Sequence, residues 1–564
     1  MLISFVISIY TLLILYVYGR GTVLWIGKIF KKTSLASMPF TLIIGLMAVT
    51  TLASFASIFI RINWEFQAFL LLGALAISLL VLRRKGFWPE RSLGDFSLAQ
   101  KIGAVFFGIS LIVLLYAATL YPANPDTGIY HAQAIHWIES YPAVPGLANL
   151  HQRLGYDSSW LLSTAVFSFS YLNFQSFHLL TGVFFLIFAG YCYQGIHGLL
   201  GKKYSLSNFL KLGFFLSSFI FLFDQISSPG TDAPATLMVW FILTQTVQLF
   251  EERLEKDNIQ GFFLILLGFY CVTIKLSSAP ILLAALGLML ALGYFKNARK
   301  FGWTVLGSLI ILLPFITRNF ILTGYPVFPG FPINLFHFDW AYPLDGVIKE
   351  SQVIHWFAML PNMSLDEFSR LSLRDQTIQW FYNQLPRHRA ILLFIMFALA
   401  VNVLLCVFRS WRNYLWRNKN IWFIYAAAIF GCVFWFFSAP AIRFGYGFLL
   451  GTVFLLAFPL VVFSLEKSQF LVNLTRWVIL LGSIAIVGLS VKTNVKFDKV
   501  TDTLINPTPY PGWSSEPCSF ANFHLLCQAA YDSCWYSPFP CAIGGNEQVE
   551  MRGTDYSEGF KPVH

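Results

Sequence analysis

The chain has 564 residues, of which 57% are hydrophobic, 18% aromatic and only 12% charged, and its mean hydropathy is +0.65. These values exclude an ordinary soluble globular protein, because too much apolar surface would face water. The formal net charge of +11 comes from Lys and Arg in short loops between apolar runs. That pattern orients membrane proteins, so we expect a polytopic membrane protein with no nucleic-acid partner.

Apolar runs of roughly 20 residues, the length that crosses a bilayer, recur along the whole chain. We predict an all-α protein with about fourteen transmembrane helices. They lie near residues 2–18, 39–60, 66–82, 103–121, 175–199, 209–223, 234–250, 259–275, 278–295, 302–322, 391–408, 421–438, 444–465 and 471–491.

The distribution of basic residues predicts the orientation of these helices. The first run has no basic residue before it and several after it, which indicates an uncleaved helix with its N-terminus outside. That orientation places every strongly basic short loop in the cytoplasm, and an even number of crossings returns the C-terminus to the outside. These loops contain Arg83, Arg84, Lys85, Lys202, Lys203, Arg253, Lys256, Lys296, Arg299, Lys300, Arg409, Arg412, Arg417 and Lys419.

The loops divide the chain into five parts. They are the N-terminal helices (1–100), a module with a large external loop at 122–174 (101–322), an external cap (323–390), the C-terminal helices (391–492) and an external tail (493–564). The apolar segment Trp160–Asn173 is too short to cross a bilayer. We therefore expect the first large loop to contain two helices that lie along the membrane surface.

Four of the eight cysteines cluster in the polar tail, at Cys518, Cys527, Cys534 and Cys541. In an oxidising compartment such a cluster predicts two disulfides, with three pairings open. A tetrahedral zinc site is the alternative.

Five ionisable residues fall at helix ends or loops on the predicted external side: Asp126, Asp232, Lys275, Arg318 and Arg443. Ionisable residues at membrane depth are costly, so each is a functional candidate. Together they would surround an anionic lipid headgroup and a group that must lose its proton. The alternatives are structural: Asp126 and Asp232 as helix caps, and Lys275 and Arg318 as snorkelling side chains.

Two histidines follow Asp126 in the stretch "NPDTGIYHAQAIHWIE". His131 and His136 are five residues apart, a spacing that does not place two ligands on one helical face. His131 with Asp126 is a candidate site for a divalent cation. The alternative is a histidine that makes a hydrogen bond at the membrane interface.

This layout resembles the GT-C superfamily of membrane glycosyltransferases, which take sugars from polyprenyl-phosphate carriers on the non-cytoplasmic side. The resemblance covers about residues 101–491. It rests on a helix followed by a large external loop with the acidic motif "NPDTGIYH", on Asp232 in a second external loop, and on "RNFILTGYPVFP" and "APAIRFGYG". The first loop lacks the adjacent acidic pair of protein mannosyltransferases, which leaves metal dependence and acceptor open.

The resemblance implies an enzyme of the bacterial inner membrane and cell envelope, with both termini on the non-cytoplasmic side. It would transfer a hexose or pentose from a polyprenyl-phosphate donor to a glycan, lipid or protein acceptor, with inversion. Asp126 would be the base or position the acceptor, and Asp232 would assist. Lys275, Arg318 and Arg443 would hold the donor phosphate. Tyr130, His131, Trp137 and Tyr156 are candidate sugar or acceptor contacts, and a Mg or Mn ion is a candidate cofactor.

Two other functions stay open. An O-antigen polymerase or ligase would rely on residues of the 323–390 loop, namely His355, Arg370, Arg374, Arg387, His388 and Arg389. A transporter or flippase of lipid-linked saccharide would show inverted repeats and polar groups near the midplane, whereas the polar groups here gather at one face.

Overall fold

A computed structural model describes residues 1–30, 37–81, 96–172, 177–252, 258–330, 332–417, 421–465, 469–495, 503–508, 515–528, 533–535 and 539–563. Six of the predicted cytoplasmic basic residues lie outside the described ranges: Arg83, Arg84, Lys85, Arg253, Lys256 and Lys419.

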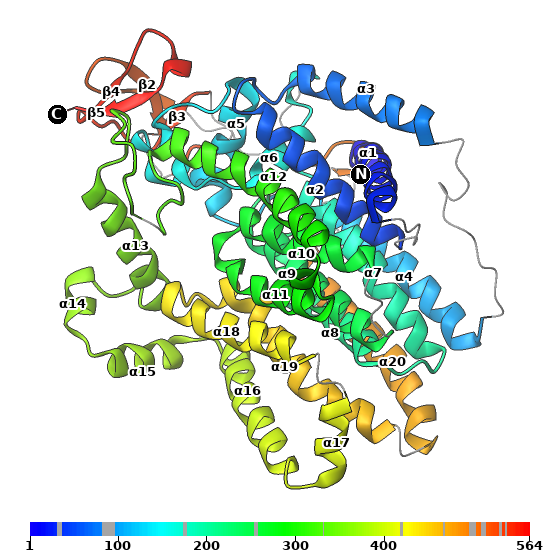
Figure 1. The fold of residues 1–564 in the computed structure, drawn as a ribbon. Helices are drawn as coiled ribbons and strands as arrows, with labels where there is room; N and C mark the ends of the chain where they lie inside the picture. The colour runs from blue at the N-terminus through cyan, green and yellow to red at the C-terminus, as the bar shows by residue number, and fades with distance from the viewer. Residues whose placement is uncertain are drawn as a thin grey trace.

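The described chain is a bundle of helices with a small strand module at its C-terminal end (Figure 1). In the N-terminal part the helices are α1 (Leu2–Phe30), α2 (Met38–Ala56), α3 (Trp64–Val81), α4 (Leu98–Ala117), η1 (Thr127–His131), α5 (Ala132–Ser140), η2 (Leu147–Asn149), η3 (Gln152–Gly155) and α6 (Ser159–Val166). They continue with α7 (Leu180–Leu200), α8 (Leu206–Phe221), α9 (Asp232–Glu251), α10 (Ile259–Ile274), η6 (Leu276–Ile281), α11 (Leu282–Ala291) and α12 (Ala298–Thr323).

The C-terminal part begins with three short helices that form the cap, α13 (Leu344–Met359), α14 (Leu365–Arg370) and α15 (Leu373–Asn383). The remaining helices are α16 (Pro386–Leu405), α17 (Arg409–Arg417), α18 (Trp422–Ser438), α19 (Ile442–Leu465) and α20 (Gln469–Asn494). In Figure 1 the cap lies at the left, next to the C-terminal strands, and α16 and α17 form the lower edge of the molecule.

Nine helices in the described ranges are long and apolar enough to cross a membrane: α1, α2, α4, α7, α9, α12, α16, α19 and α20. The other predicted crossings are also helical, but α3, α8, α10 and α11 have shorter apolar stretches, and α18 forms a bent pair with α17. The multi-pass helical architecture is therefore confirmed, while the count of fourteen crossings stays a prediction.

Helices α1 and α2 cross closely at two glycines. A Cβ atom on Gly19 would lie 2.0 Å from the carbonyl oxygen of Thr41, and one on Gly45 would lie 1.8 Å from that of Leu15. Small residues allow such backbone contact where lipid supplies no hydrophobic driving force. Substitution by any larger residue would force the two helices apart.

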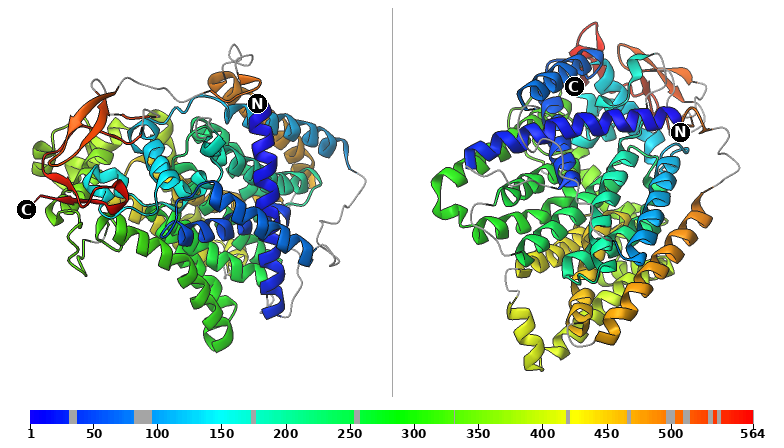
Figure 2. Two further views of the ribbon diagram at one scale, coloured as in Figure 1. Left: turned by 90° about the horizontal axis from the view of Figure 1, so that it is seen from above. Right: turned by 90° about the vertical axis from the view of Figure 1, so that its right-hand side faces the viewer.

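Contacts between distant segments place the N-terminus and residues 503–508 on one side of the bundle. The amino group of Met1 donates hydrogen bonds to the carbonyl oxygens of Thr503 and Ile505. The N–H of Thr508 donates to the carbonyl of Thr119, just after α4, at 2.8 Å. Because Asp126 follows Thr119 closely in the chain, we call this side of the bundle the Asp126 side. Figure 2 shows the N-terminus beside the described segment that follows α20.

The large loop after α4 contains two short helices, α5 and α6. All eight residues of α6 are buried inside the protein, and the orientation of these helices along a membrane surface stays a prediction. The hydroxyl of Ser163 is 2.6 Å from that of Thr50 on α2, and the hydroxyl of Ser159 is 2.8 Å from that of Thr273 on α10. These polar partners explain why the segment packs inside, because buried hydroxyls need hydrogen bonds.

The tail folds into two small sheets. Strand β1 (Ser515–Ser519) pairs antiparallel with β2 (His524–Gln528), β3 (Cys541–Ala542) pairs parallel with β2, and β4 (Val549–Met551) pairs antiparallel with β5 (Phe560–Pro562). Disulfides join Cys518 to Cys527 and Cys534 to Cys541. The prediction of two disulfides is confirmed, and one of the three pairings is selected.

The tail packs on the loop that follows Asp126. Its core side chains Phe520, Phe523 and Phe560 share one hydrophobic cluster with Trp137 and Leu147 of that loop. In Figure 1 the strands lie beside α5 at the upper left. The tail is therefore part of the Asp126 side of the fold.

Candidate functional site

Four of the five charged residues predicted to converge form one network, which we call the charge cluster: Asp126, Asp232, Lys275 and Arg443. Arg443 joins both carboxylates, because its Nη2 lies 2.9 Å from Oδ2 of Asp126 and its Nε lies 3.4 Å from Oδ2 of Asp232. Lys275 donates a hydrogen bond to the other oxygen of Asp232. Two acids thus share two cations.

Each member of the charge cluster lies at the end of a different helix. Asp126 precedes η1, Asp232 is the first residue of α9, Lys275 follows the last residue of α10, and Arg443 is in the first turn of α19. The capping interpretation does not hold for Asp126, whose side chain makes no capping hydrogen bond. Both carboxylates are instead used in ion pairs.

Phe444 lies under both cations of the cluster. The Nζ atom of Lys275 is 3.6 Å from the centre of its ring, and the guanidinium carbon of Arg443 is 5.0 Å away. Cations over an aromatic face are attracted by its negative quadrupole. The ring therefore helps to hold both positive charges at one place, although the Arg443 side chain is still 41% exposed.

A cavity adjoins the charge cluster. Its lining combines the Asp232–Lys275 pair and three hydroxyl side chains with apolar ones, from Thr236, Ser277, Ser278, Ala235, Val239, Phe444, Gly447 and Phe448. The cavity therefore brings a paired cation and apolar side chains together.

Tyr130 and His131 follow Asp126 on η1. Burial lowers the pKa of His131 to about 4, although Asp126 and Asp232 oppose that shift. Its side chain is buried, and its Nδ1 atom has no hydrogen-bond partner among the described residues. Burial, and then the charge of Asp126, raises the pKa of Tyr130. Both residues are therefore neutral near pH 7, and neither adds charge to the cluster.

Arg153 is a neighbour of the cluster that sequence reasoning missed. Its Nη1 atom lies 3.5 Å from Oδ1 of Asp126, the oxygen that Arg443 does not contact. An arginine in the middle of a long polar loop carries no local signal of function. Only the fold of η3 onto η1 places it there.

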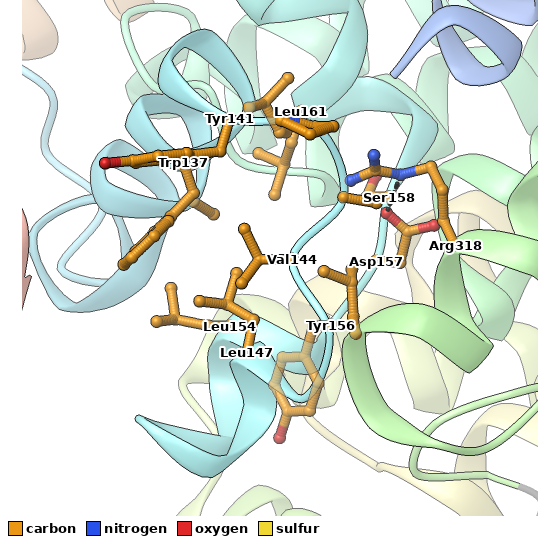
Figure 3. Close-up of a pocket in the computed structure, with 15 residues that line it drawn as sticks. Trp137, Tyr141, Val144, Leu147, Leu154, Tyr156, Asp157, Ser158, Leu161 and Arg318 are labelled. Atoms are coloured by element: carbon orange, nitrogen blue, oxygen red, sulfur yellow. Dashed lines mark hydrogen bonds and ion pairs between the residues drawn. The ribbon is translucent and has the colours of Figure 1, made fainter. Parts of the chain in front are cut away.

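Arg318, the fifth predicted residue, belongs to a different site (Figure 3). Its Nε lies 3.2 Å from Oδ1 of Asp157, and its Nη1 donates to the Ser57 hydroxyl at 2.8 Å. Only 4% of the Arg318 side chain and 3% of the Asp157 side chain are exposed. The structure thus does not bring Arg318 to the charge cluster, because α12 carries it to the end of α2 instead.

The Arg318–Asp157 pair lines a second cavity, whose other walls include Trp137, Tyr141, Val144, Leu147, Leu154 and Tyr156 (Figure 3). Burial raises the pKa of Asp157, while the nearby Arg318 opposes the shift. The remaining oxygen, Oδ2, has no hydrogen-bond partner among the described residues.

Two of the predicted sugar or acceptor contacts, Trp137 and Tyr156, have structural partners. Trp137 packs edge-on against Phe539 of the tail, with 4.9 Å between the ring centres. Tyr156 donates a hydrogen bond to Glu350 of the cap and lies 5.8 Å from the ring of Tyr130. They connect the loop after Asp126 to the tail and to the cap.

The cap contacts the turn that precedes Arg443. The Nδ1 atom of His355 lies 3.2 Å from the carbonyl oxygen of Ser438, and the indole N–H of Trp380 donates to the carbonyl of Pro440 at 3.0 Å. The Nε2 atom of His388, at the start of α16, lies 2.9 Å from the hydroxyl of Tyr446. Thus His355 and His388, which the sequence analysis assigns to the alternative polymerase or ligase site, contact the segment around Arg443.

The predicted cation site at Asp126 and His131 lacks a ligand set. In the described parts of the chain, no three His, Cys, Asp or Glu side chains are grouped so as to hold a metal ion. Both acids of the charge cluster are already paired with Lys or Arg. A divalent cation at this site therefore stays a prediction.

Comparisons with known proteins identified a family model that matches the chain. No curated protein and no solved structure matches the chain. A family model described as a domain of unknown function, DUF8201, matches residues 1–450, a segment that contains the whole charge cluster and ends within α19. Since this match covers far more than half of the 564 residues, the chain belongs to the DUF8201 family.

Proposed function

We propose that the protein is a membrane glycosyltransferase that moves a sugar from a polyprenyl-phosphate donor to an acceptor hydroxyl. The observation that carries the proposal is the charge cluster, in which Arg443 joins Asp126 to Asp232 beside Lys275. Acids and cations meet where a largely apolar cavity begins, a combination that suits a lipid carrying a phosphate.

The donor phosphate would bind to Lys275 and Arg443. Arginine engages two oxygens of a phosphate at once, and lysine acts as a point charge. The hydrocarbon chain of the lipid would extend along the apolar walls formed by Val239 and Phe448. On binding, the phosphate would compete with the carboxylates for Arg443, whose partly exposed side chain is accessible to it.

The proposed reaction needs only the donor, the acceptor and the residues of the charge cluster. The acceptor oxygen forms a bond to the anomeric carbon of the sugar while the bond between that carbon and the phosphate oxygen breaks, and polyprenyl phosphate leaves with the electron pair. Asp126 takes the proton of the acceptor hydroxyl as the general base. Lys275 and Arg443 stabilise the negative charge that develops on the leaving phosphate. Attack opposite the leaving group inverts the anomeric centre.

The location of the reaction follows from the distribution of basic residues. Among the described residues, Lys202 and Lys203 lie between α7 and α8, Lys296 lies just before α12, and Lys300 is in the first turn of α12. The positive-inside rule assigns these connections to the cytoplasm. We therefore place the Asp126 side, with its disulfide-bonded tail, on the non-cytoplasmic face of a bacterial inner membrane. Disulfides persist in that compartment.

The proposal is tested by Asp126→Asn with Asp339→Asn as the matched control. Asp339 is also paired with an arginine, Arg552, but it is half exposed and outside the charge cluster. The assay supplies membranes containing the protein with a panel of polyprenyl-phosphate hexoses and pentoses that carry labelled sugar, and it measures release of polyprenyl phosphate and label in glycan, lipid or protein.

We expect wild type and Asp339→Asn to consume one donor equally, and Asp126→Asn to lose about 1,000-fold in rate, within the range of a removed general base. Full activity of Asp126→Asn would overturn the proposal, as would a wild type that consumes no donor of the panel. Retained polymerisation in Asp126→Asn together with its loss in His355→Ala would favour the polymerase or ligase alternative. Movement of label across the bilayer without a new glycosidic bond would favour the flippase.

A further inference from the structure

The loop closed by the Cys534–Cys541 disulfide contacts the segment that carries Asp126. The backbone N–H of Trp535 donates to the carbonyl of Gly128 at 2.9 Å. The indole lies against Gly128 so closely that a Cβ atom there would be 2.2 Å from Cε2 of Trp535. The ring of Tyr121 completes this contact, with 5.3 Å between the ring centres. A tail residue thus fits against η1 two positions after Asp126.

A second attachment uses one buried side chain, Gln133 of α5. Its amide nitrogen donates to the carbonyl of Trp535 at 3.2 Å, and its amide oxygen accepts from the N–H of Cys541 at 3.3 Å. Gln133 is only 2% exposed. Both ends of the disulfide loop are therefore attached to the same helical segment, which a chance surface contact does not explain.

The conformation of Trp535 depends on these attachments. Its φ angle is +42°, a value that bulky side chains rarely adopt. Such a conformation persists only when the surroundings hold it. Trp535 is held by the disulfide that joins its neighbour Cys534 to Cys541, and by its own backbone hydrogen bonds to Gly128 and Gln133.

The segment η1 is also attached to the body of the protein. The hydroxyl of Thr127 lies 2.7 Å from that of Ser228, in the segment before α9. The segment η1 is a single π-helical stretch of five residues, a type that is frequent at functional sites. It thus contacts both the segment before α9 and the tail.

We propose that Trp535, presented by the Cys534–Cys541 loop, is a positioning residue for Asp126. The Asp126 carboxylate makes no capping bond to its own helix, so its position relative to Arg443 depends on where η1 lies. This inference rests on the proposed function for its catalytic consequence. The contact also identifies a role for the tail, all of which lies beyond the segment matched by the family model.

The first experiment compares Trp535→Ala with Phe523→Ala and Trp535→Phe in the full-length protein. Phe523 is the matched control, because it is a buried aromatic residue of the same tail that stacks on Phe520 at 4.5 Å. The readouts are amide hydrogen exchange of residues 127–136, and the separate kcat and KM of transfer.

We expect Trp535→Ala to speed exchange in this segment about tenfold or more, and to lower kcat with the donor KM unchanged. Phe523→Ala removes a side chain from the cluster against which Tyr130 and Ala134 of this segment pack, so it should speed exchange less than Trp535→Ala does. Trp535→Phe should restore both readouts. Equal exchange in Trp535→Ala and wild type would overturn the inference. The exchange result does not depend on activity, so it stands even if the glycosyltransferase proposal fails.

The second experiment is a double-mutant cycle between the tail and η1. Gly128→Ala alone should speed exchange of residues 127–136 and lower kcat, because its methyl group would clash with the indole ring. Gly128→Ala combined with Trp535→Ala should be no worse than Trp535→Ala alone, since the clash is gone. Additive effects of the two substitutions would contradict a direct contact.

Discussion

Two sites on the Asp126 side pair a carboxylate with a guanidinium, and they differ in almost every other respect. Arg443 contacts two acids, its side chain is 41% exposed, and it lies near a cavity with apolar walls. Arg318 contacts one acid, Asp157, and only 4% of its side chain is exposed. The first is a network whose members have alternative partners, whereas the second is a sealed pair.

Under the proposed function, this difference separates a ligand-binding arrangement from a structural one. A ligand with negative charge can displace a carboxylate from Arg443, because the freed Asp126 keeps Arg153 nearby. Displacing Asp157 from Arg318 would leave an unpaired charge inside the protein, which is very costly. We therefore expect the two arginines to respond in opposite ways to the same substitution.

The largest effect on stability is expected for Arg318→Met. It leaves Asp157 buried without its partner, and loss of one member of a buried pair costs about 3–5 kcal/mol. Arg318→Met with Asp157→Leu should recover most of that loss, because no charge is left unpaired. Thermal and denaturant unfolding in detergent measure both changes. A variant that keeps wild-type stability but loses donor binding would instead place Arg318 in the donor site.

The corresponding Arg443→Met substitution is expected to affect transfer. Removing one group that stabilises developing negative charge typically costs about 100- to 1,000-fold in rate. Stability should change little, since Asp232 keeps Lys275 and Asp126 keeps Arg153. Single-turnover transfer beside an unfolding curve gives both quantities. Equal losses of stability in Arg443→Met and Arg318→Met would remove the distinction between the two sites.

A smaller effect concerns the pH dependence contributed by His131. Its pKa is about 4 in the folded protein, below the ordinary value of 6.5, so between these values the unfolded chain binds more protons. Stability from this residue is therefore present above pH 6.5 and lost as the pH falls toward 4, by roughly 3 kcal/mol in all. His131→Asn should lose less stability than wild type between pH 7 and pH 5. If the free energies of unfolding of the two proteins changed equally with pH, the lowered pKa of His131 would be contradicted.

The smallest effect is expected for the surface pair of Arg552 and Asp339. Its closest contact is 2.9 Å, but half of the Asp339 side chain is exposed, and exposed pairs contribute only about 0.2–1 kcal/mol. Arg552→Gln should thus change the free energy of unfolding by less than about 1 kcal/mol, with a weaker effect in high salt. A loss comparable to that of Arg318→Met would show that ion-pair geometry alone, without burial, controls stability in this protein.

Much of the architecture was predictable because its signals are local. Apolar runs identify helices that cross or enter the membrane, since each run must bury its own backbone hydrogen bonds. The four tail cysteines predict two disulfides from their number and surroundings. The alternation of basic loops also places Asp126, Asp232, Lys275 and Arg443 at the same depth, and in the structure these four residues are in contact.

By itself, the sequence determined the position of residues along the helix axes. It shows which residues lie in apolar helices and which helix ends lie on the same side of the bundle. It did not determine the position of each helix end around the bundle. For this reason the sequence places Arg318 with Asp126 and Asp232, whereas the structure pairs it with Asp157. Arg443 and Asp126 are 317 residues apart, and Arg318 and Asp157 are 161 apart. Only the tertiary packing decided these pairs and the contact of Trp535 with Gly128, because each depends on side-chain fit between segments that no local pattern connects.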